Sequence, residues 1–302
     1  MLKPLRTRFL IVQNPRAGWY RSRLFGATLD KLSSAGASFE ITRPSDSAEG
    51  TQRIEAAARS GAYDAIIAAG GDGTIHGVVG GLIGSSTPLG IIPTGTSNVF
   101  AHEIGLDSTP SALAQTLLHG TARDVPVGQV NGEPFVFIVG VGFDAEAVRH
   151  FEAAEMRHLG RASYVLPVLR ALSQTPGRRS LVVTTENGRS RAHWVIVTRV
   201  KHYAANLLLA AEADFRSPLF YVIRFGEGGR FALMRQLAAL MTHLLPLDPE
   251  VSIEAVKRVT IDGDASCPVQ IDGEFKGKLP IDIRLHAKRI NLICPIKPGG
   301  TS

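Results

Sequence analysis

Over the first 123 residues, short apolar runs alternate with longer stretches in which apolar residues recur at helical spacing. The short runs are typical of buried strands, and the longer stretches are typical of amphipathic helices. Alternation of this kind indicates a parallel sheet with helices on both faces. The predicted strands are residues 9–12, 39–42, 65–69 and 89–92, and the predicted helices are residues 21–35, 48–61 and 75–82.

From Asp124 onward, strand-like runs dominate the pattern. Asn187-Gly188, between two of these runs, is a favourable hairpin turn. This half of the chain is therefore predicted to be an antiparallel β-sandwich. Its predicted strands are residues 135–139, 180–184, 194–198, 219–223, 259–261 and 281–285. We expect two domains, residues 1–123 and 124–296, followed by a disordered tail at residues 297–302.

The most informative motif is Gly-Gly-Asp-Gly-Thr at residues 70–74, directly after a predicted buried strand. Glycines let the backbone turn sharply and leave no Cβ to keep a ligand away. Successive N–H groups in such a turn form a concavity that binds anions, and a helix that begins there adds its positive end. A carboxylate in this place, here Asp72, is expected to hold a metal ion or to accept a proton. An ordinary surface turn is the alternative for an isolated Gly-Asp-Gly.

A second glycine loop, Pro-Thr-Gly-Thr-Ser-Asn at residues 93–98, follows the next predicted strand. Ligands of a parallel sheet bind outside the carboxyl ends of its strands, which is where both loops are expected. The order of the elements therefore predicts one shared site for nucleotide phosphates. The candidate nucleotide-binding residues are Asn14, Thr42, Gly70, Gly71, Asp72, Gly73, Thr74, His76, Gly95, Thr96 and Asn98.

The two loops and three further motifs, at residues 14–18, 140–145 and 269–274, give a resemblance to a known family. The chain resembles the diacylglycerol kinase catalytic family, which includes bacterial soluble lipid kinases, sphingosine kinases and ceramide kinases. Gly-Gly-Asp-Gly also occurs in NAD kinases and phosphofructokinases, whereas the second loop and the late Asp-Gly-Glu separate the lipid kinases from those relatives. The resemblance implies a kinase that uses ATP and Mg²⁺ to phosphorylate a hydroxyl of a membrane lipid such as diacylglycerol or ceramide. It also implies a nucleotide-binding first domain, similar to that of NAD kinases and phosphofructokinases, and a lipid-binding second domain.

The late motif Asp272-Gly273-Glu274 is the candidate catalytic segment. In a strand, this spacing puts both carboxylates on one face, where their repulsion would make one of them a better proton acceptor. A hairpin turn is the alternative interpretation of Asp-Gly-Glu. The resemblance implies that the motif reaches the γ-phosphate and supplies the base, although the loop aspartate is an alternative base. The candidate catalytic residues are therefore Glu274, Asp272 and Asp72, and the candidate Mg²⁺ ligands are Asp72 and Asp272.

Three positions depart from the family's pattern. His76 and Gly77 stand where family members usually have Asn and Glu. A turn of the second domain keeps Asp214 but has Ser217 in place of a second Asp. These departures support a second hypothesis, a lipid- or nucleotide-binding pseudokinase without transfer activity, and an NAD kinase is a third. No motif distinguishes among diacylglycerol, ceramide, a sphingoid base and phosphatidylglycerol as the acceptor.

Two stretches with helical composition interrupt the β pattern of the second half. Residues 145–172 are basic and include Arg149, Arg157 and Arg161, which are expected to attract anionic lipid. Residues 230–245 are apolar around most of their circumference, which is typical of a core helix. The alternative is that they line a groove for acyl chains or enter a membrane interface. The candidate lipid-binding residues are Phe231, Met234 and Met241.

The composition narrows the choice of partner. A formal net charge of +6 favours an acidic partner, either nucleotide phosphates or an anionic membrane surface. Nucleic acid is disfavoured, because the chain has no RNA-binding aromatic signature, zinc-finger spacing or dense basic run. Two cysteines are too few for a disulfide framework and indicate a reducing compartment, and no apolar run approaches the ~20 residues that span a bilayer. We therefore expect a cytoplasmic protein that associates peripherally with the inner face of the membrane; a homodimer is left open.

Overall fold

The chain forms two compact units in the computed structural model, which describes residues 5–14, 22–44, 46–95, 97–152, 180–203 and 207–296. One unit holds the described residues up to Pro126 together with those from Ala287 onward, and the other holds Val127–His286. The chain leaves the first unit within strand β5 (Thr121–Val130) and returns to it within strand β18 (Ile281–Cys294).

This return differs from the expectation that residues 124–296 belong to one domain. The second half of β18 pairs in parallel with β4 (Leu89–Pro93), with Leu292 opposite Leu89. Local pattern predicted only the first residues of this long strand, 281–285. Its later residues join a sheet formed by distant parts of the chain, and pattern within one segment carries no information about such pairing.

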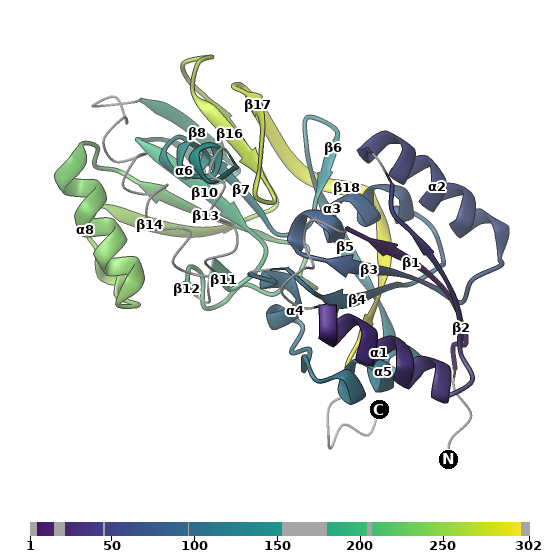
Figure 1. Ribbon diagram of the computed structural model, residues 1–302. Helices are drawn as coiled ribbons and strands as arrows, with labels where there is room; N and C mark the ends of the chain where they lie inside the picture. The colour runs from purple at the N-terminus through teal and green to yellow at the C-terminus, as the bar shows by residue number, and fades with distance from the viewer. Residues whose placement is uncertain are drawn as a thin grey trace. The chain divides into compact units, whose positions relative to one another are not determined.

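The first unit is built on a parallel sheet in the strand order β2-β1-β3-β4-β18 (Figure 1). All six residues of β3 are buried, as expected for a parallel strand covered on both faces. The four strands predicted for this half are confirmed. They are β1 (Arg8–Gln13), β2 (Ser38–Thr42), β3 (Ala65–Gly70) and β4.

Helices cover both faces of this sheet (Figure 1). Helix α1 (Ser22–Ser34) packs with α5 (Pro110–His119), and α2 (Ser47–Ser60) packs with α3 (Asp72–Leu82). The chain first moves from β1 to β2 and then crosses back over β1 to β3. Because crossovers between parallel strands are right-handed, this reversal places α1 and α2 on opposite faces. Ligands of such sheets bind outside the carboxyl ends of the strands at the point where the strand order reverses.

The second unit is an antiparallel β-sandwich, as predicted. Its larger sheet has the strand order β14-β13-β10-β7-β16-β17. On the other side, β8 (Leu181–Thr185) pairs with β15 (Arg258–Asp262), which pairs with the first half of β18. The strands of the larger sheet are β7 (Ile138–Val141), β10 (Trp194–Thr198), β13 (Phe220–Phe225), β14 (Val251–Val256), β16 (Pro268–Ile271) and β17 (Glu274–Lys278).

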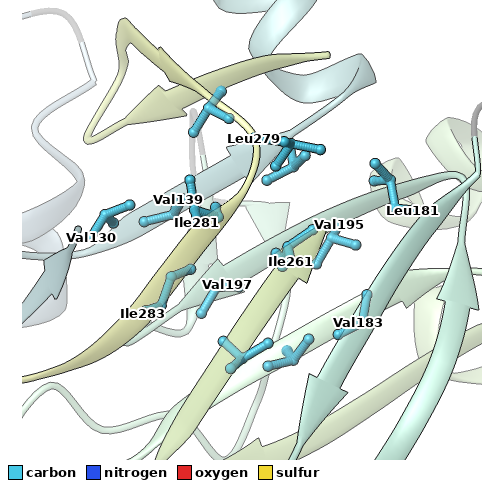
Figure 2. Close-up of a cluster of buried hydrophobic side chains, with 14 of the residues drawn as sticks. Val130, Val139, Leu181, Val183, Val195, Val197, Ile261, Leu279, Ile281 and Ile283 are labelled. Carbon is cyan, nitrogen blue, oxygen red and sulfur yellow. The ribbon is translucent and has the colours of Figure 1, made fainter. Parts of the chain in front are cut away.

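Apolar side chains from both layers form the core of the sandwich (Figure 2). Val195 and Val197 come from β10, and Val183 comes from β8. Ile281 and Ile283 come from β18. Alternate residues of each strand contribute, because successive side chains of a strand point to opposite faces.

Three segments of the second unit differ from their predicted form. The predicted strand 135–139 is broken, since β6 (Glu133–Phe135) ends before β7 begins. The predicted helix 230–245 ends at Met241 as α8 (Arg230–Met241), and His243 takes a left-handed φ of 60°. The predicted hairpin after β8 is present, but its second strand is the polar β9 (Gly188–Ala192), which an apolar pattern does not reveal.

The predicted helix 145–172 is described only over α6 (Phe143–Glu152), and the predicted tail at residues 297–302 lies outside the described residues. Of the helices that the structure describes, none is both long enough and apolar enough to cross a membrane.

Candidate active site

The turn between β3 and α3 carries the Gly-Gly-Asp-Gly-Thr motif. Helix α3 begins at Asp72, earlier than the predicted start at Ile75. The reason is that the N–H groups of Thr74 and Ile75 both donate to the carbonyl of Gly71, at 3.0 and 3.2 Å. Asp72, Gly73 and Thr74 therefore form the first turn of the helix, where backbone N–H groups carry the positive end of its dipole.

Thr74 explains why position 70 is glycine. A Cβ at Gly70 would lie 2.0 Å from Oγ1 of Thr74, so the hydroxyl occupies the space that a side chain at position 70 would need. This hydroxyl is buried and has no hydrogen-bond partner among the residues that the structure describes. Because buried polar groups are nearly always hydrogen-bonded, Thr74 Oγ1 fits a bound group that offers an acceptor oxygen, such as a phosphate.

The second loop, between β4 and α4 (Val99–Glu103), is closed by Asn98. Asn98 has a left-handed φ of 48°, which asparagine tolerates better than most residues. Its Oδ1 accepts the N–H of Gly95 at 2.9 Å, and its Nδ2 donates to the carbonyl of Gly95 at 2.7 Å. Asn98 thus holds its own loop together, and its predicted contact with nucleotide stays a prediction. Thr96 lies outside the described residues.

The two loops contact each other at their glycines. The N–H groups of Thr94 and Gly95 donate to the carbonyl of Gly70, at 3.0 and 3.3 Å. A Cβ at Gly95 would lie 2.4 Å from Cα of Gly71. This close approach of two backbones requires glycine at position 95.

Asp72 links the two turns through its side chain. Its carboxylate accepts the N–H groups of Val99 and Phe100, at 3.1 and 3.2 Å, in the first turn of α4. It therefore satisfies helix N–H groups that have no partner within the helix. The residue is half-buried, and a carboxylate is a ligand that Mg²⁺ commonly takes, so Asp72 is a candidate ligand for a cation.

The remaining candidates of the first unit lie at the same edge of the sheet. Strands β1 and β2 end level with each other, because their register pairs Val12 with Thr42. Asn14 follows β1 and is exposed, whereas Thr42 is buried. Gly73 is exposed, and His76 is half-buried in the second turn of α3. The structure brings these positions together as expected from the order of the elements, and their roles in binding stay predictions.

The described residues fit a Mg²⁺ ion that arrives with a nucleotide better than a metal enclosed by protein. Within the described ranges, no three His, Cys, Asp or Glu side chains gather as a metal-binding group. Mg²⁺ commonly takes one or two protein carboxylates and completes its octahedron with water and phosphate oxygens. Asp72 fits that pattern as a single protein ligand.

Asp272 and Gly273 form the turn of the β16–β17 hairpin. Ile271 pairs with Glu274 across the turn, and the φ angles of Asp272 and Gly273 are 50° and 86°. Two positive φ angles in a two-residue connection are the mark of a type I′ turn, in which Asp-Gly is a favoured sequence. The hairpin interpretation is therefore correct, and the prediction that both carboxylates share one face of a strand is wrong.

The carboxylate of Asp272 accepts three backbone N–H groups. The donors are Val136, Phe137 and Ile138, at 2.7, 2.9 and 3.0 Å. Their N–H groups turn to this carboxylate at the point where the predicted strand 135–139 is broken. Asp272 is 3% exposed, and charge-assisted bonds of this kind hold it firmly. The structure thus gives Asp272 a role in fixing the hairpin and offers no support for its predicted role as a Mg²⁺ ligand.

Glu274 has a different environment from Asp272. Its side chain is 44% exposed, and its carboxylate lies 3.3 Å from the ammonium of Lys276, which also pairs with Glu133 at 2.6 Å. Burial lowers the pKa of Lys276, but the hydrogen bond to Glu133 and the charge of Glu274 outweigh it, so the pKa is raised. Lys276 therefore stays charged beside Glu274. Of the two carboxylates in the motif, Glu274 is the more exposed.

Two family models match this chain. Residues 8–130 match the diacylglycerol kinase catalytic domain, and residues 137–294 match the YegS C-terminal NAD kinase beta sandwich-like domain. The chain belongs to the diacylglycerol kinase catalytic family. Membership in this lipid kinase family implies ATP as the phosphate donor.

Similar proteins include a named kinase. The chain is 28% identical over 300 residues to the Bacillus subtilis (strain 168) diacylglycerol kinase, a match that covers 95% of this chain and 96% of that protein. It is 24% identical over 238 residues to an uncharacterized Synechocystis protein, covering 77% of this chain and spanning about half (55%) of that relative. A solved structure of a candidate diacylglycerol kinase from Bacillus anthracis str. Sterne has a TM-score of 0.78 at 19% identity, with 97% of this chain and 96% of that one covered. This last likeness shows the fold.

A buried network in the second unit is centred on Asp144, a residue of the motif at residues 140–145 for which no role was predicted. Asp144, in the first turn of α6, accepts hydrogen bonds from Nε2 of Gln270 (2.7 Å) and from the hydroxyl of Tyr203. Oε1 of Gln270 accepts the N–H of Gly273 at 2.8 Å, so the network links α6 to the Asp-Gly-Glu hairpin. A Cβ at Gly140 would lie 1.6 Å from Oδ2 of Asp144. The sequence carries a signal for this network. As at residues 65–72, a predicted strand is followed by glycines and an aspartate, here from Gly140 to Asp144.

Asp144→Asn is expected to change how stability depends on pH. Burial raises the pKa of Asp144 above its ordinary 3.8, although the hydrogen bonds from Tyr203 and Gln270 oppose the shift. A carboxyl with a raised folded-state pKa stabilises the fold fully below its unfolded pKa, and this contribution is lost as the pH rises through the folded pKa. The wild type should therefore lose unfolding free energy from acidic to neutral pH relative to Asp144→Asn. Urea denaturation of both proteins across that range measures the difference, and parallel profiles would contradict it.

Two further groups that the sequence analysis considered are ion-paired. The guanidinium of Arg149 lies 2.5 Å from the carboxylate of Glu146, also in α6. Arg157 and Arg161 lie outside the described residues. Asp214 pairs with Nε and Nη2 of Arg216, at 2.9 and 2.6 Å. The hydrogen bond from Arg216 lowers the pKa of Asp214. In the turn that keeps Asp214, the aspartate is therefore engaged by an arginine of the same turn.

The candidate lipid-binding residues lie on the exposed face of α8. Phe231, Met234 and Met241 are exposed, whereas Leu233 and Leu240 are buried. The expectation of a core helix is therefore correct for one face of α8 and wrong for the other. Contact of the exposed residues with lipid stays a prediction.

Proposed function

We propose that this protein is an ATP-dependent lipid kinase that transfers the γ-phosphate of ATP to a hydroxyl of a membrane lipid. The observation that carries the proposal is the joined pair of turns after β3 and β4, linked by Asp72 and by the contact of Gly71 with Gly95. Family membership supports a kinase, and the Bacillus subtilis relative is named a diacylglycerol kinase. Diacylglycerol is therefore the first acceptor to test, followed by ceramide, a sphingoid base and phosphatidylglycerol.

In this proposal the first unit binds the nucleotide. Phosphoryl transfer needs charge neutralisation and alignment more than covalent help from the protein. Backbone N–H groups at the start of α3 and the buried hydroxyl of Thr74 would bind phosphate oxygens. Asp72 would hold Mg²⁺, which when bound neutralises negative charge on the phosphates.

Glu274 is the proposed base. Its half-exposed carboxylate can accept the proton of an attacking hydroxyl, which is the usual part of a general base in such a transfer. Asp272 would act as a positioning residue, because its three backbone bonds fix the hairpin that carries Glu274. Asp72 is the alternative base.

Incubation of the protein with γ-labelled ATP, Mg²⁺ and each acceptor in turn tests the proposal. We expect label in phosphorylated diacylglycerol or a related lipid, and none with NAD⁺ as acceptor. Asp72→Asn is the inactive comparison and should lower turnover with every lipid. Label on NAD⁺ alone would identify an NAD kinase instead.

A lipid- or nucleotide-binding protein without transfer activity is the second candidate function. It is favoured by the carboxylate of Asp272, which is engaged by three N–H donors, and by Gly77 in place of the family's usual Glu. ATP binding without labelling of any acceptor would support it. Comparison of lipid extracts from cells with and without the protein would show whether a phosphorylated lipid depends on it.

A further inference from the structure

Helix α8 is anchored firmly along one face. Oε1 of Gln236 accepts the indole N–H of Trp194 at 2.9 Å, and Nε2 of Gln236 donates to the carbonyl of Glu227 at 3.3 Å. Leu233 and Leu240 are buried on the same side. A buried hydrogen bond flanked by apolar contacts sets which face of the helix points inward.

The opposite face presents large apolar side chains to solvent. Phe231 is 90% exposed and Met241 is 71% exposed, and Met234 lies between them. At 100° per residue these positions fall within a narrow arc, so they form one line along the helix. Leu244 and Leu247, just beyond the helix, are exposed as well. We call these five residues the α8 stripe. Large apolar side chains exposed next to one another often mark a surface that binds a partner or a membrane.

The ionisable side chains within the segment that carries the α8 stripe are all basic. Residues 228–247 contain no Asp or Glu, and their ionisable side chains are Arg230, Arg235 and His243. The guanidinium of Arg235 forms ion pairs with Glu227 at 3.0 Å and Asp248 at 2.9 Å, the acidic residues just outside the two ends of this segment. Arg230 is exposed directly before Phe231, and His243 is exposed directly before Leu244. Apolar residues flanked by basic ones complement an anionic bilayer, whose headgroups attract cations and whose acyl region receives the apolar side chains.

We infer that the α8 stripe is the surface by which this protein docks onto an anionic lipid bilayer. The inference rests on the proposed function, because a lipid acceptor with long chains is available at a membrane surface. It adds α8 to the basic residues 145–172 as an expected contact with anionic lipid. A second copy of the chain fits this surface less well, because a two-fold pairing would bring the same basic segment of both copies together.

Sedimentation of the full chain with vesicles of equal parts phosphatidylglycerol and phosphatidylcholine tests the inference. Phe231→Ser combined with Met241→Ser should weaken vesicle binding by about tenfold or more, because two apolar side chains no longer enter the bilayer. Leu5→Ser combined with Ile296→Ser is the matched control, since Leu5 and Ile296 are exposed apolar residues outside the second unit. The control should bind vesicles as the wild type does.

A charge variant tests the electrostatic part of the inference. Arg230→Glu should weaken binding to the anionic vesicles and leave binding to pure phosphatidylcholine vesicles unchanged. Added salt should reduce the difference between wild type and Arg230→Glu. Thermal unfolding of each variant verifies that it is folded, which is expected because every substituted side chain is exposed.

Vesicle binding that is equal in the wild type and the Phe231/Met241 double variant would overturn the inference. If the wild type is also a dimer in solution and the double variant a monomer, the α8 stripe is instead a contact between copies. Phosphorylation of a short-chain, water-soluble diacylglycerol by the wild type is measured separately. Its absence counts against the proposed function, whereas vesicle binding that does not depend on the stripe counts against docking alone.

Discussion

Gly95→Ala is expected to abolish ATP binding while the fold survives. A Cβ at this position would lie 2.4 Å from Cα of Gly71 and 2.9 Å from Oδ1 of Asn98. Neither neighbour can yield easily, because one is backbone and the other is held by two hydrogen bonds to Gly95 itself. The β4–α4 loop must therefore move away from the β3–α3 turn. That movement also weakens the bonds from Asp72 to α4, so the surface proposed to bind phosphates is lost.

Calorimetric titration with ATP measures this loss, and urea denaturation measures the accompanying loss of stability. Forcing an extra methyl group into a close contact typically costs about 1–3 kcal/mol, less than the usual stability of a folded protein of about 5–15 kcal/mol. Gly80→Ala in α3 is the matched control, because the nearest atom to its Cβ would be Oγ1 of Thr51 at 3.9 Å. It should keep wild-type ATP affinity and gain up to about 1 kcal/mol from helix propensity. Unchanged ATP affinity in folded Gly95→Ala would remove the two loops from the nucleotide site.

Asp272→Asn is expected to lower stability and Glu274→Gln to lower turnover, although the residues are two positions apart. An asparagine offers a single acceptor oxygen, and its NH₂ group would face an N–H that Asp272 now accepts. Because the site is buried, we expect Asp272→Asn to lower the free energy of unfolding by about 2–4 kcal/mol. Glu274 is half-exposed and paired with Lys276, so Glu274→Gln should change stability by less than about 1 kcal/mol.

Measurement of turnover tests the catalytic role of Glu274 separately from the structural role of Asp272. If Glu274 is the base, Glu274→Gln should lower turnover by about 10²–10⁴ with little change in ATP affinity. Urea denaturation and the labelled-ATP assay on both variants give the two readouts. Near-normal turnover of Glu274→Gln together with an inactive Asp72→Asn would move the base to Asp72. An Asp272→Asn protein as stable as the wild type would contradict the structural role of Asp272.

Local sequence pattern predicted the fold class of both halves. The period and length of apolar runs are properties of neighbouring residues. They predicted β1 to β4 and, in the second unit, β8, β10, β13, β15 and the first part of β18. The placement of the two glycine loops at one edge also followed, because successive parallel strands end on the same side of a sheet. The pattern was least informative for polar strands such as β9, which carries no apolar run.

The chemistry of individual side chains depended on tertiary structure. Asp272 bonds to amides 134 to 136 positions earlier in the chain, and those bonds both break the predicted strand 135–139 and bury a carboxylate expected to share a strand face with Glu274. The same holds for Asp144, whose partners Gln270 and Tyr203 come from distant segments. Composition indicated a helix that is apolar around most of its circumference, whereas the face of α8 that points inward is fixed by the bond between Gln236 and Trp194. The physical reason is common to all three: strand and helix preferences are local, whereas a buried polar group takes whichever partner the fold brings to it.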